Sequence, residues 1–356
     1  MSALAHAPTT RFDSPDDLTA AEPPERRGVA RDGVRMLVAR PNSIAHTTFG
    51  QLTEHLRPGD LVVVNNSATV AAELDGARAD GGAVVVHVAT ALDERHAVVE
   101  LRTAPDAARP VLDASARERV TLRSQVGAIQ LLDPYPDGGG SPAGRGNRLW
   151  RARLDLALPL AAALAAHGRP IAYGYLSRRW PLADYQTVFA REPGSAEMPS
   201  AGRPFTVDLV TRLVSSGVAV APITLHTGVS SQDAGEPPQP ERFRVSAATA
   251  RLVNAVRAGG GRVVAVGTTV TRALESAVGP DGWAQERAGW TDHIVDPDHP
   301  ARVVDGLISG WHNPDASHLL LVEAVAGPDL TQRAYDAAVE RRYLWHEFGD
   351  SCLLLP

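Results

Sequence analysis

Residues 262–275 read RVVAVGTTVTRALE, and this stretch decides the fold class. Its first five residues are largely β-branched and apolar, which predicts a strand at 262–266 that is buried on both faces. Gly267 then permits a tight turn, and one of the threonines that follow can cap a helix predicted at 270–277. A buried strand that leads directly into a helix is the repeating unit of α/β proteins with a parallel sheet.

The same alternation of strand and helix runs through most of the chain. Strands are predicted at 34–39, 60–64, 218–225, 262–266, 303–309 and 352–355, and helices at 49–56, 207–216, 247–258, 270–277, 318–326 and 330–342. The continuous apolar pattern within 60–64 (DLVVV) is typical of a strand covered on both faces. We therefore predict an α/β main domain with parallel strands.

Between residues 74 and 169 the pattern changes. Short strand-like segments at 83–88, 97–102, 120–123 and 128–132 alternate with Gly, Asp and Pro turns, and a helix is predicted at 156–167. Closely spaced short strands indicate a small barrel or sandwich. The predicted fold class is thus α/β and multi-domain. Residues 1–74 plus 170–356 form the main domain with the active-site cleft, and residues 75–169 form an inserted β-barrel-like domain.

The composition excludes several kinds of chemistry. The chain of 356 residues carries 35 positive side chains and no lysine, so all 35 are arginines. Schiff-base catalysis, a phosphate-binding P-loop and a protein kinase each require a lysine, and so does a Ser-Lys dyad. A codon bias in a GC-rich genome would explain the missing lysine without a functional reason, but the exclusions hold in either case.

Other global features limit the location and the partners. The single cysteine, Cys352, excludes a disulfide framework and a cysteine-rich metal site. The formal net charge of −6 does not mark the chain as a nucleic-acid binder, although local arginines could form a patch. No apolar stretch reaches the length of a membrane span, and none resembles a signal peptide. We expect a cytoplasmic protein without membrane contact, as a monomer or a weak homo-oligomer.

Polar residues follow three of the predicted strands, at the points where those strands end. Asn65 and Asn66 follow the first strand, His226 lies at the end of the second, and Gly267 follows the third. Ligands of open α/β sheets bind at the carboxyl ends of the strands. These residues are therefore expected to border one shared cleft.

The third strand end has the clearest binding chemistry. N–H groups at the start of the helix favour a carboxylate or a phosphate, and Thr268 or Thr269 can supply a cap. Arg272 lies in the first turn, where a carboxylate could accept two hydrogen bonds from it. The alternative is an ordinary helix cap with Arg272 in solvent.

Two histidines, His312 and His318, flank Asp315 and raise the question of a metal site. They are six positions apart, Pro314 interrupts any helix between them, and zinc usually needs a third protein ligand, so no metal site is predicted. His312 follows an apolar strand and fits a cleft position. An equally good interpretation is a partly buried histidine that is bonded to the backbone.

The ordered motifs resemble the S-adenosylmethionine:tRNA ribosyltransferase-isomerase family of queuosine biosynthesis. The motifs are 56–66 (LRPGDLVVVNN), 184–190 (DYQTVFA), 224–226 (TLH), 262–275, Leu307-Ile308, His312, Pro314, Ser317, Tyr343 and Gly349-Asp350. They are collinear over nearly the whole chain, from about Phe12 to Leu354. The resemblance implies an α/β domain with an inserted β-barrel.

The resemblance also implies a reaction. Members of the family take S-adenosylmethionine as co-substrate and transfer its ribosyl part to the aminomethyl group of a 7-deazaguanine base in tRNA. The ribose rearranges to an epoxycyclopentanediol, and adenine and methionine leave. A sulfonium acidifies its neighbouring carbons, so a base can start this rearrangement without a metal or a lysine.

The chain departs from the family pattern at polar positions. Residues 199–205 read PSAGRPF where the family has PTAGLHF, and Gln239 replaces a family histidine while Glu241 remains. Two hypotheses follow from these changes. The chain carries out the family reaction on tRNA, or it is a diverged paralogue that binds S-adenosylmethionine or a related nucleoside. Such a paralogue would act on a small-molecule acceptor or would be a non-catalytic binding protein.

The resemblance assigns a hypothetical role to each site residue. Gly267, Thr268, Thr269 and Arg272 would hold the methionine carboxylate or the ribose, and Asn65 and Asn66 would bind the ribose or adenine. His226 and His312 are the first candidates for acid–base chemistry, because histidine titrates near neutrality. Glu241 and Asp350 are second candidates, and Glu347 is a further possible base.

Overall fold

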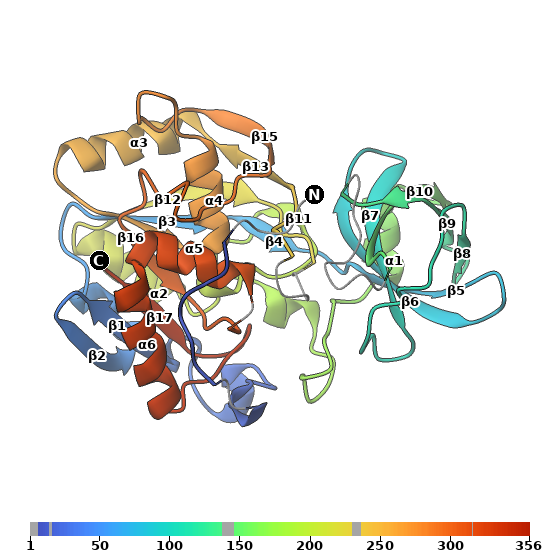
Figure 1. Cartoon of the computed structure of the whole chain (residues 1–356), viewed down its shortest axis with the longest axis horizontal. Coiled ribbons are helices and arrows are strands. Elements are labelled where there is room, and N and C mark those ends of the chain that lie inside the picture. The colour runs from blue at the N-terminus through green and yellow to red at the C-terminus, as the bar shows by residue number, and fades with distance from the viewer. Residues whose placement is uncertain (1–5, 14–15, 137–145, 230–235, 315) are drawn as a thin grey trace.

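A nine-stranded mixed sheet forms the centre of the larger lobe (Figure 1). The computed structural model describes residues 6–13, 16–136, 146–229, 236–314 and 316–356. The strand order is β15 (Arg287–Thr291), β13 (Glu241–Val245), β12 (Ala219–Leu225), β3 (Leu61–Asn65), β14 (Val263–Val266), β16 (Gly306–Ser309), β17 (Ser351–Leu354), β1 (Arg35–Arg40) and β2 (Ser43–Thr48). The central strands β12, β3, β14 and β16 are parallel, which confirms the predicted α/β fold.

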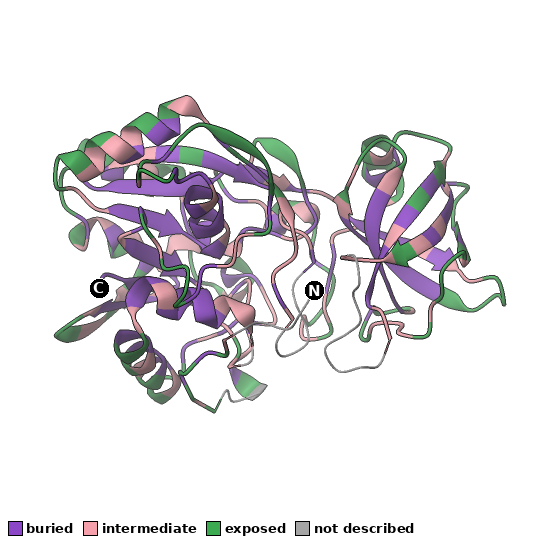
Figure 2. Cartoon of the chain, turned by 45° about the horizontal axis from the view of Figure 1, so that its top comes forward, coloured by how far each residue is buried: buried purple, intermediate pink, exposed green. Residues whose placement is uncertain are grey.

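Both faces of this sheet are covered, as Figure 2 shows. Leu61 and Val63 of β3 join one core with α3 (Ala247–Ala258), α4 (Thr268–Ser276), α5 (Ser317–Ala326) and α6 (Pro328–Glu340). Val62 and Val64 join a second core on the other face, with α2 (Val207–Ser215) and the short 3₁₀ helix η4 (Phe49–Glu54). Successive side chains of a strand point to opposite faces, so the unbroken LVVV run supplies both cores.

The smaller lobe is a closed six-stranded barrel (Figure 1). Its strands are β5 (Glu73–Ala77), β6 (Ala83–Ala91), β7 (His96–Thr103), β8 (Arg119–Leu122), β9 (Gly127–Pro134) and β10 (Leu149–Leu156), in the order β10-β7-β6-β5-β8-β9. Helix α1 (Leu160–His167) contributes Ala163 and Leu164 to the core of the barrel. Of the two architectures considered for this region, the structure contains the barrel.

The chain enters and leaves the barrel at one place. Glu73 and Arg169 exchange two backbone hydrogen bonds, of 2.9 and 3.0 Å from nitrogen to oxygen. The Arg169 guanidinium also donates to the carboxylates of Glu73 and Asp75. The barrel strands lie within residues 73–156, so the division at 75 and 169 remains our interpretation of where the inserted domain begins and ends.

Some elements differ from the sequence-based expectation. The segment expected as a helix at 49–56 is 3₁₀ helix η4, and α4 begins at Thr268 rather than at residue 270. Strands β2, β13 and β15 were not predicted. Strand β15 is exposed over four of its five residues and lacks the apolar alternation on which the prediction relied.

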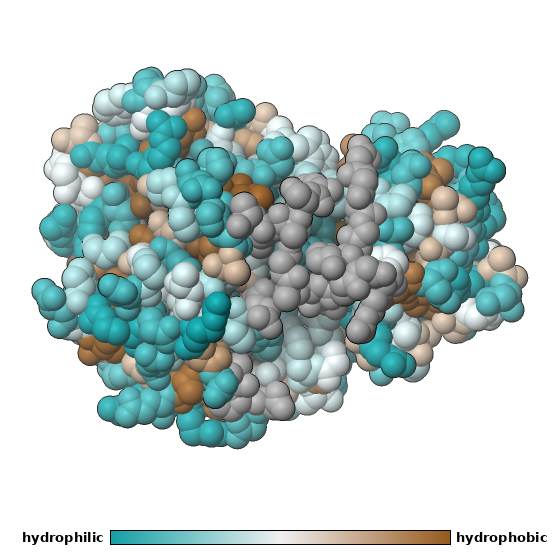
Figure 3. Space-filling view, in the orientation of Figure 1, coloured by the Kyte–Doolittle hydropathy of each residue, from teal (hydrophilic) through white to brown (hydrophobic). Residues whose placement is uncertain are grey.

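Hydrophilic side chains cover most of the visible face of both lobes (Figure 3). Within the described ranges, no helix is both long enough and apolar enough to cross a membrane.

Asp60 ties together the starts of two central strands. It is fully buried before β3 and accepts hydrogen bonds from the Arg57 backbone, from the Arg262 backbone and from the Arg262 guanidinium. Burial raises the pKa of Asp60, but these hydrogen bonds hold it below its ordinary value of 3.8. The ionised carboxylate therefore stabilises the alignment of β3 with β14.

The substitution Asp60→Asn is expected to lower the free energy of unfolding at pH 7 by about 3 kcal/mol, since Arg262 loses its buried partner. The loss should shrink as the pH falls below 3.8, because protonation removes the same charge from the wild type. Urea denaturation at several pH values measures this difference. Asp208→Asn, at an exposed pair with Arg212, is the control, with an expected change of about 0.5 kcal/mol or less. Equal effects of the two substitutions would contradict this role of Asp60.

Candidate active site

A cavity of about 580 Å³ lies at the carboxyl ends of the parallel strands. Thr227 and Gly228 follow β12, residues 267–269 follow β14, and residues 309–313 continue from the end of β16; all of them line the cavity. Parallel α/β sheets bind their ligands in this position, and the volume suits a small molecule of nucleoside size. The expected shared cleft therefore has a counterpart in the structure.

Some of the predicted site residues line this cavity and others do not. Its walls include Gly267, Thr268, Thr269, Arg272, Glu241 and His312. The residues that support the walls without lining them are Asn65, Asn66, His226 and Asp350. The role of each residue in binding or catalysis stays a prediction.

Helix α4 starts at the cavity without a side-chain cap. Its N-cap residue is Gly267, with a φ of 91° that favours glycine, and this residue provides no side-chain hydrogen bond to the first turn. The expectation that a threonine caps this helix is therefore wrong: Thr271 instead donates to the Gly267 carbonyl. An uncapped first turn leaves N–H groups for an anionic group of a ligand.

Arg272 is buried and bonded to the protein. Its guanidinium pairs with Glu241 and donates to three carbonyl oxygens, those of Gln239 (3.0 Å), His293 (3.2 Å) and Thr291 (3.3 Å). It thus ties α4 to the segments around β13 and β15, and it does not extend into solvent. A ligand carboxylate would have to replace one of these acceptors, so the geometry favours an indirect role for Arg272.

Glu241 faces the cavity beside this arginine. Burial raises the pKa of Glu241 above its ordinary value, and the charge of Arg272 and the Gly228 N–H, at 3.1 Å from the carboxylate, oppose this only in part. The Arg272–Glu241 pair therefore forms part of one cavity wall, where the positive charge of Arg272 offsets the negative charge of Glu241.

Asn65 holds two strand ends together behind the cavity wall. Its side-chain nitrogen donates to the Leu225 carbonyl at 2.8 Å, and its oxygen accepts from the backbone of Leu225 and Ser67. The same nitrogen lies 3.4 Å from the Thr269 hydroxyl, which lines the cavity. Asn66 accepts a hydrogen bond from the Thr224 hydroxyl in the same way. The two amides therefore position the wall.

His226 lies in a chain of polar side chains next to the cavity. Its Nδ1 is 2.7 Å from the Ser67 hydroxyl, which is 2.6 Å from the Ser195 hydroxyl. Burial lowers the pKa of His226 below its usual range. A Cβ at Gly194 would lie only 2.7 Å from Nδ1, so the glycine is needed for this close approach.

His312 lines the cavity as a neutral imidazole. Its Nε2 is 2.9 Å from the Ser309 hydroxyl, and its ring stacks on His318 with 5.1 Å between centroids. Burial lowers the pKa of His312 well below its usual range and that of His318 to about 4. Near neutral pH, His312 can accept a proton or a hydrogen bond but cannot act as a charged acid. Asp315 lies outside the described residues, and the rest of the described chain contains no group of three or more side chains suited to a metal.

The opposite wall contains functional candidates that the sequence analysis did not select. Tyr173, Tyr175, Glu197 and His346 all line the cavity. Tyr173 donates a hydrogen bond to Glu197, and the Tyr175 ring stacks on His346 at 4.6 Å and 14°. The available signal was the Tyr-Gly-Tyr spacing in a chain with few aromatic residues.

Arg102 brings the barrel to the same cavity. It lies at the end of β7, lines the cavity, and pairs with Glu100 inside the barrel at 2.8 Å. Its guanidinium also lies 5.5 Å from the centre of the Tyr173 ring. The cavity is thus bounded by both lobes.

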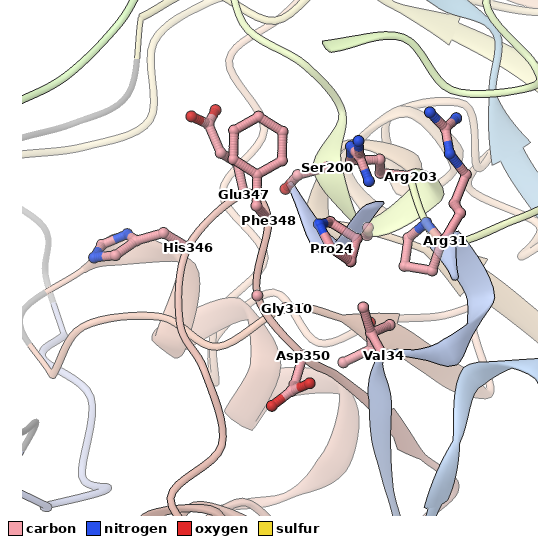
Figure 4. A pocket seen from close by; sticks show the side chains of 14 residues that line it. Pro24, Arg31, Val34, Ser200, Arg203, Gly310, His346, Glu347, Phe348 and Asp350 are labelled. Carbon is pink, nitrogen blue, oxygen red and sulfur yellow. The ribbon is translucent and has the colours of Figure 1, made fainter. Parts of the chain in front are cut away.

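Residues 346–350 separate the cavity from a small recess of about 10 Å³ (Figure 4). Figure 4 shows Glu347 and Asp350 pointing in opposite directions from this segment. Asp350 accepts hydrogen bonds from the Arg35 backbone and guanidinium, both at 2.9 Å, and from the Leu344 N–H at 2.8 Å. Asp350 therefore anchors the segment, and Glu347 is the carboxyl that lines the cavity.

The substitution Arg272→Ala is expected to lower the free energy of unfolding by about 3 kcal/mol, because Glu241 would lose its buried cation. Adding Glu241→Gln to this variant should recover part of the loss, since no unpaired charge remains. Guanidinium denaturation measures both changes. Arg251→Ala, on the exposed face of α3, is the control, with an expected change within about 0.5 kcal/mol. An Arg272→Ala protein as stable as this control would contradict the structural role of the pair.

Comparisons with known proteins agree with this arrangement. The family model described as "Queuosine biosynthesis protein" matches residues 9–354. An S-adenosylmethionine:tRNA ribosyltransferase-isomerase of Symbiobacterium thermophilum is 36% identical over 97% of this chain and 98% of its own length. The enzyme of the same name from a Methylobacterium strain is 36% identical over 96% of each chain. A crystal structure of S-adenosylmethionine tRNA ribosyltransferase from Thermotoga maritima has a TM-score of 0.52 and 26% identity, over 97% of this chain and 99% of that one. The chain therefore belongs to the queuosine biosynthesis protein family.

Proposed function

We propose that the chain is an S-adenosylmethionine:tRNA ribosyltransferase-isomerase. It would transfer and isomerise the ribosyl part of S-adenosylmethionine onto a 7-aminomethyl-7-deazaguanine in tRNA, with release of adenine and methionine. The observation that carries the proposal is that segments far apart in the chain line one cavity, in a chain that the family model matches over residues 9–354. The proposed activity places the protein in the cytoplasm, where tRNA is modified.

The chemistry of the walls supports S-adenosylmethionine as the ligand. The uncapped start of α4 and the hydroxyls of Thr268 and Thr269 suit the carboxylate of the amino-acid part. The stacked rings of Tyr175 and His346 supply aromatic surface for a purine. Neutral histidines and carboxyl groups at the walls can move protons.

The position of the barrel supports a large acceptor. Because Arg102 lines the cavity from the barrel side, an acceptor base could enter between the lobes while the rest of the RNA remains outside. In a chain without lysine, phosphates would be contacted by arginines, N–H groups and hydroxyls. Electrostatic contacts of this kind weaken with salt.

The altered family motif does not remove the cavity. Ser200 and Ala201, within the changed 199–205 segment, still line it. Arg203, which stands where the family has leucine, is buried, pairs with Glu25 at 3.0 Å and packs over the Phe348 ring. The packing around the site thus accommodates the altered residues of segment 199–205. An adenine-release experiment distinguishes the family reaction from the activity of a diverged paralogue.

Incubation with S-adenosylmethionine and tRNA that carries the aminomethyl-deazaguanine base should release adenine in step with modification of the tRNA. The measurement is chromatographic detection of adenine and mass spectrometry of the digested tRNA. The same tRNA with guanine at that position is the control and should give no adenine, because the amine nucleophile is missing. Adenine formed equally without the modified tRNA would indicate a small-molecule acceptor or hydrolysis. Tight binding without any adenine would indicate a binding protein, and either result would contradict the proposal.

A further inference from the structure

Two carboxyl groups face the cavity, and each lies beside a tyrosine of the same short segment. Tyr173 donates a hydrogen bond to Glu197, and Tyr175 is near enough to Glu347 to influence the pKa of its carboxyl group. Both tyrosines and both glutamates line the cavity. One Tyr-Gly-Tyr segment therefore lies beside two acidic groups that come from distant parts of the chain.

The backbone around each glutamate is held in place. The carbonyl of Glu197 accepts a hydrogen bond from the Thr227 hydroxyl at the end of β12. Glu347 follows His346, whose φ of 69° lies in the left-handed region. A residue other than glycine rarely adopts this conformation, which costs about 1–3 kcal/mol and clusters at functional sites. The anchor at Asp350 and the stacking of His346 on Tyr175 maintain this turn.

Glu347 also has unused hydrogen-bonding capacity. Its Oε1 is buried and has no hydrogen-bond partner within the part of the chain that the structure describes. In Figure 4 its carboxyl group extends away from the segment, on the side opposite to Asp350. A buried carboxyl oxygen without a partner is costly unless a ligand, a water or a proton satisfies it.

The groups around Glu347 determine the protonation of its carboxyl group. The groups that face Glu347 are Glu197, Arg203, Tyr175, Tyr185 and the neutral His346. Burial, followed by the charge of Glu197, raises the pKa of Glu347 to about 8, and Arg203 and Tyr175 only partly oppose this. Glu347 therefore carries a proton at neutral pH. A buried carboxyl group that keeps its proton can serve as the acid beside a second carboxyl group that serves as the base.

We propose that Glu347 is the general acid and Glu197 the general base of the reaction in this cavity. The assignment rests on the proposed function. The Glu197 carboxylate takes the proton from the ribose carbon bonded to the sulfonium sulfur, the C–H electron pair stays on that carbon, and Glu197 releases this proton to solvent before the next turnover. Glu347 gives its proton to the adenine nitrogen as the bond from ribose to adenine breaks, and the electron pair of that bond stays on the nitrogen. Glu347 is then a carboxylate that must regain a proton from solvent before the next turnover.

The substitutions Glu347→Gln and Glu197→Gln test the two roles. Each should lower kcat for adenine release by about 10²–10⁴-fold, the usual contribution of a positioned acid or base. The affinity for S-adenosylmethionine, measured by calorimetry, should change by only a few fold, because glutamine keeps the size and polarity of the side chain. Glu94→Gln, at an exposed turn of the barrel, is the matched control and should leave both quantities unchanged.

The pH profile gives a second readout that does not depend on a variant. Wild-type kcat/KM should fall as the pH rises through about 8, where Glu347 of the free enzyme loses its proton. Tyr175→Phe should shift this alkaline limb to higher pH, since the tyrosine hydroxyl lowers the pKa of the Glu347 carboxyl group. The residual activity of Glu347→Gln should lack the limb.

The outcomes separate this inference from the proposed function. A wild-type protein that releases no adenine with the modified tRNA contradicts the proposed function itself. An active wild type with Glu347→Gln or Glu197→Gln at the wild-type rate overturns the acid–base assignment and leaves the function standing. If either variant fails to fold, an activity of the wild type that stays constant from pH 7 to 10 still overturns the role of Glu347.

Discussion

Parallel pairing of β12, β3, β14 and β16 is the constraint on which the rest of the structure depends. These strands carry apolar side chains on both faces, so they are stable only between two layers of helices. Once they run in the same direction, every loop that leaves a carboxyl end must open at one edge of the sheet. The buried Asp60 fixes the opposite edge through Arg262. The apolar core thereby determines where the polar chemistry can lie, and the barrel completes the cavity from outside the sheet.

The chain has no lysine, so its permanently positive side chains are all arginines. The two arginines that line the cavity are paired, Arg272 with Glu241 and Arg102 with Glu100, and outside its lining Arg203 pairs with Glu25 and Arg35 with Asp350. These pairs fix the walls and leave little free positive charge at the centre. Such a site suits a substrate that brings its own cation, as the sulfonium of S-adenosylmethionine does. Because the arginines are paired, carboxyl groups and neutral imidazoles are the groups left to transfer protons.

Local patterns predicted the fold, and long-range contacts determined the site. The strand, turn and helix of residues 262–275 could be predicted because Gly267 and the apolar run are adjacent in sequence. The hydrogen bonds of Arg272 could not be predicted, because their acceptors lie in segments that only folding brings next to α4. Asp350 was a second candidate for acid–base chemistry as a carboxylate, yet its partner Arg35 is 315 residues away in the sequence. The pairing of Tyr173 with Glu197 depends in the same way on packing between segments.

A crystal structure of the protein with S-adenosylmethionine and an RNA stem-loop that carries the aminomethyl-deazaguanine base tests the central claim most directly. We expect S-adenosylmethionine inside the 580 Å³ cavity, with its amino-acid carboxylate at the start of α4 and its adenine within hydrogen-bonding distance of Glu347. The acceptor amine should enter from the side of Arg102. Binding of S-adenosylmethionine at any other place, with this cavity filled only by water, would contradict the account.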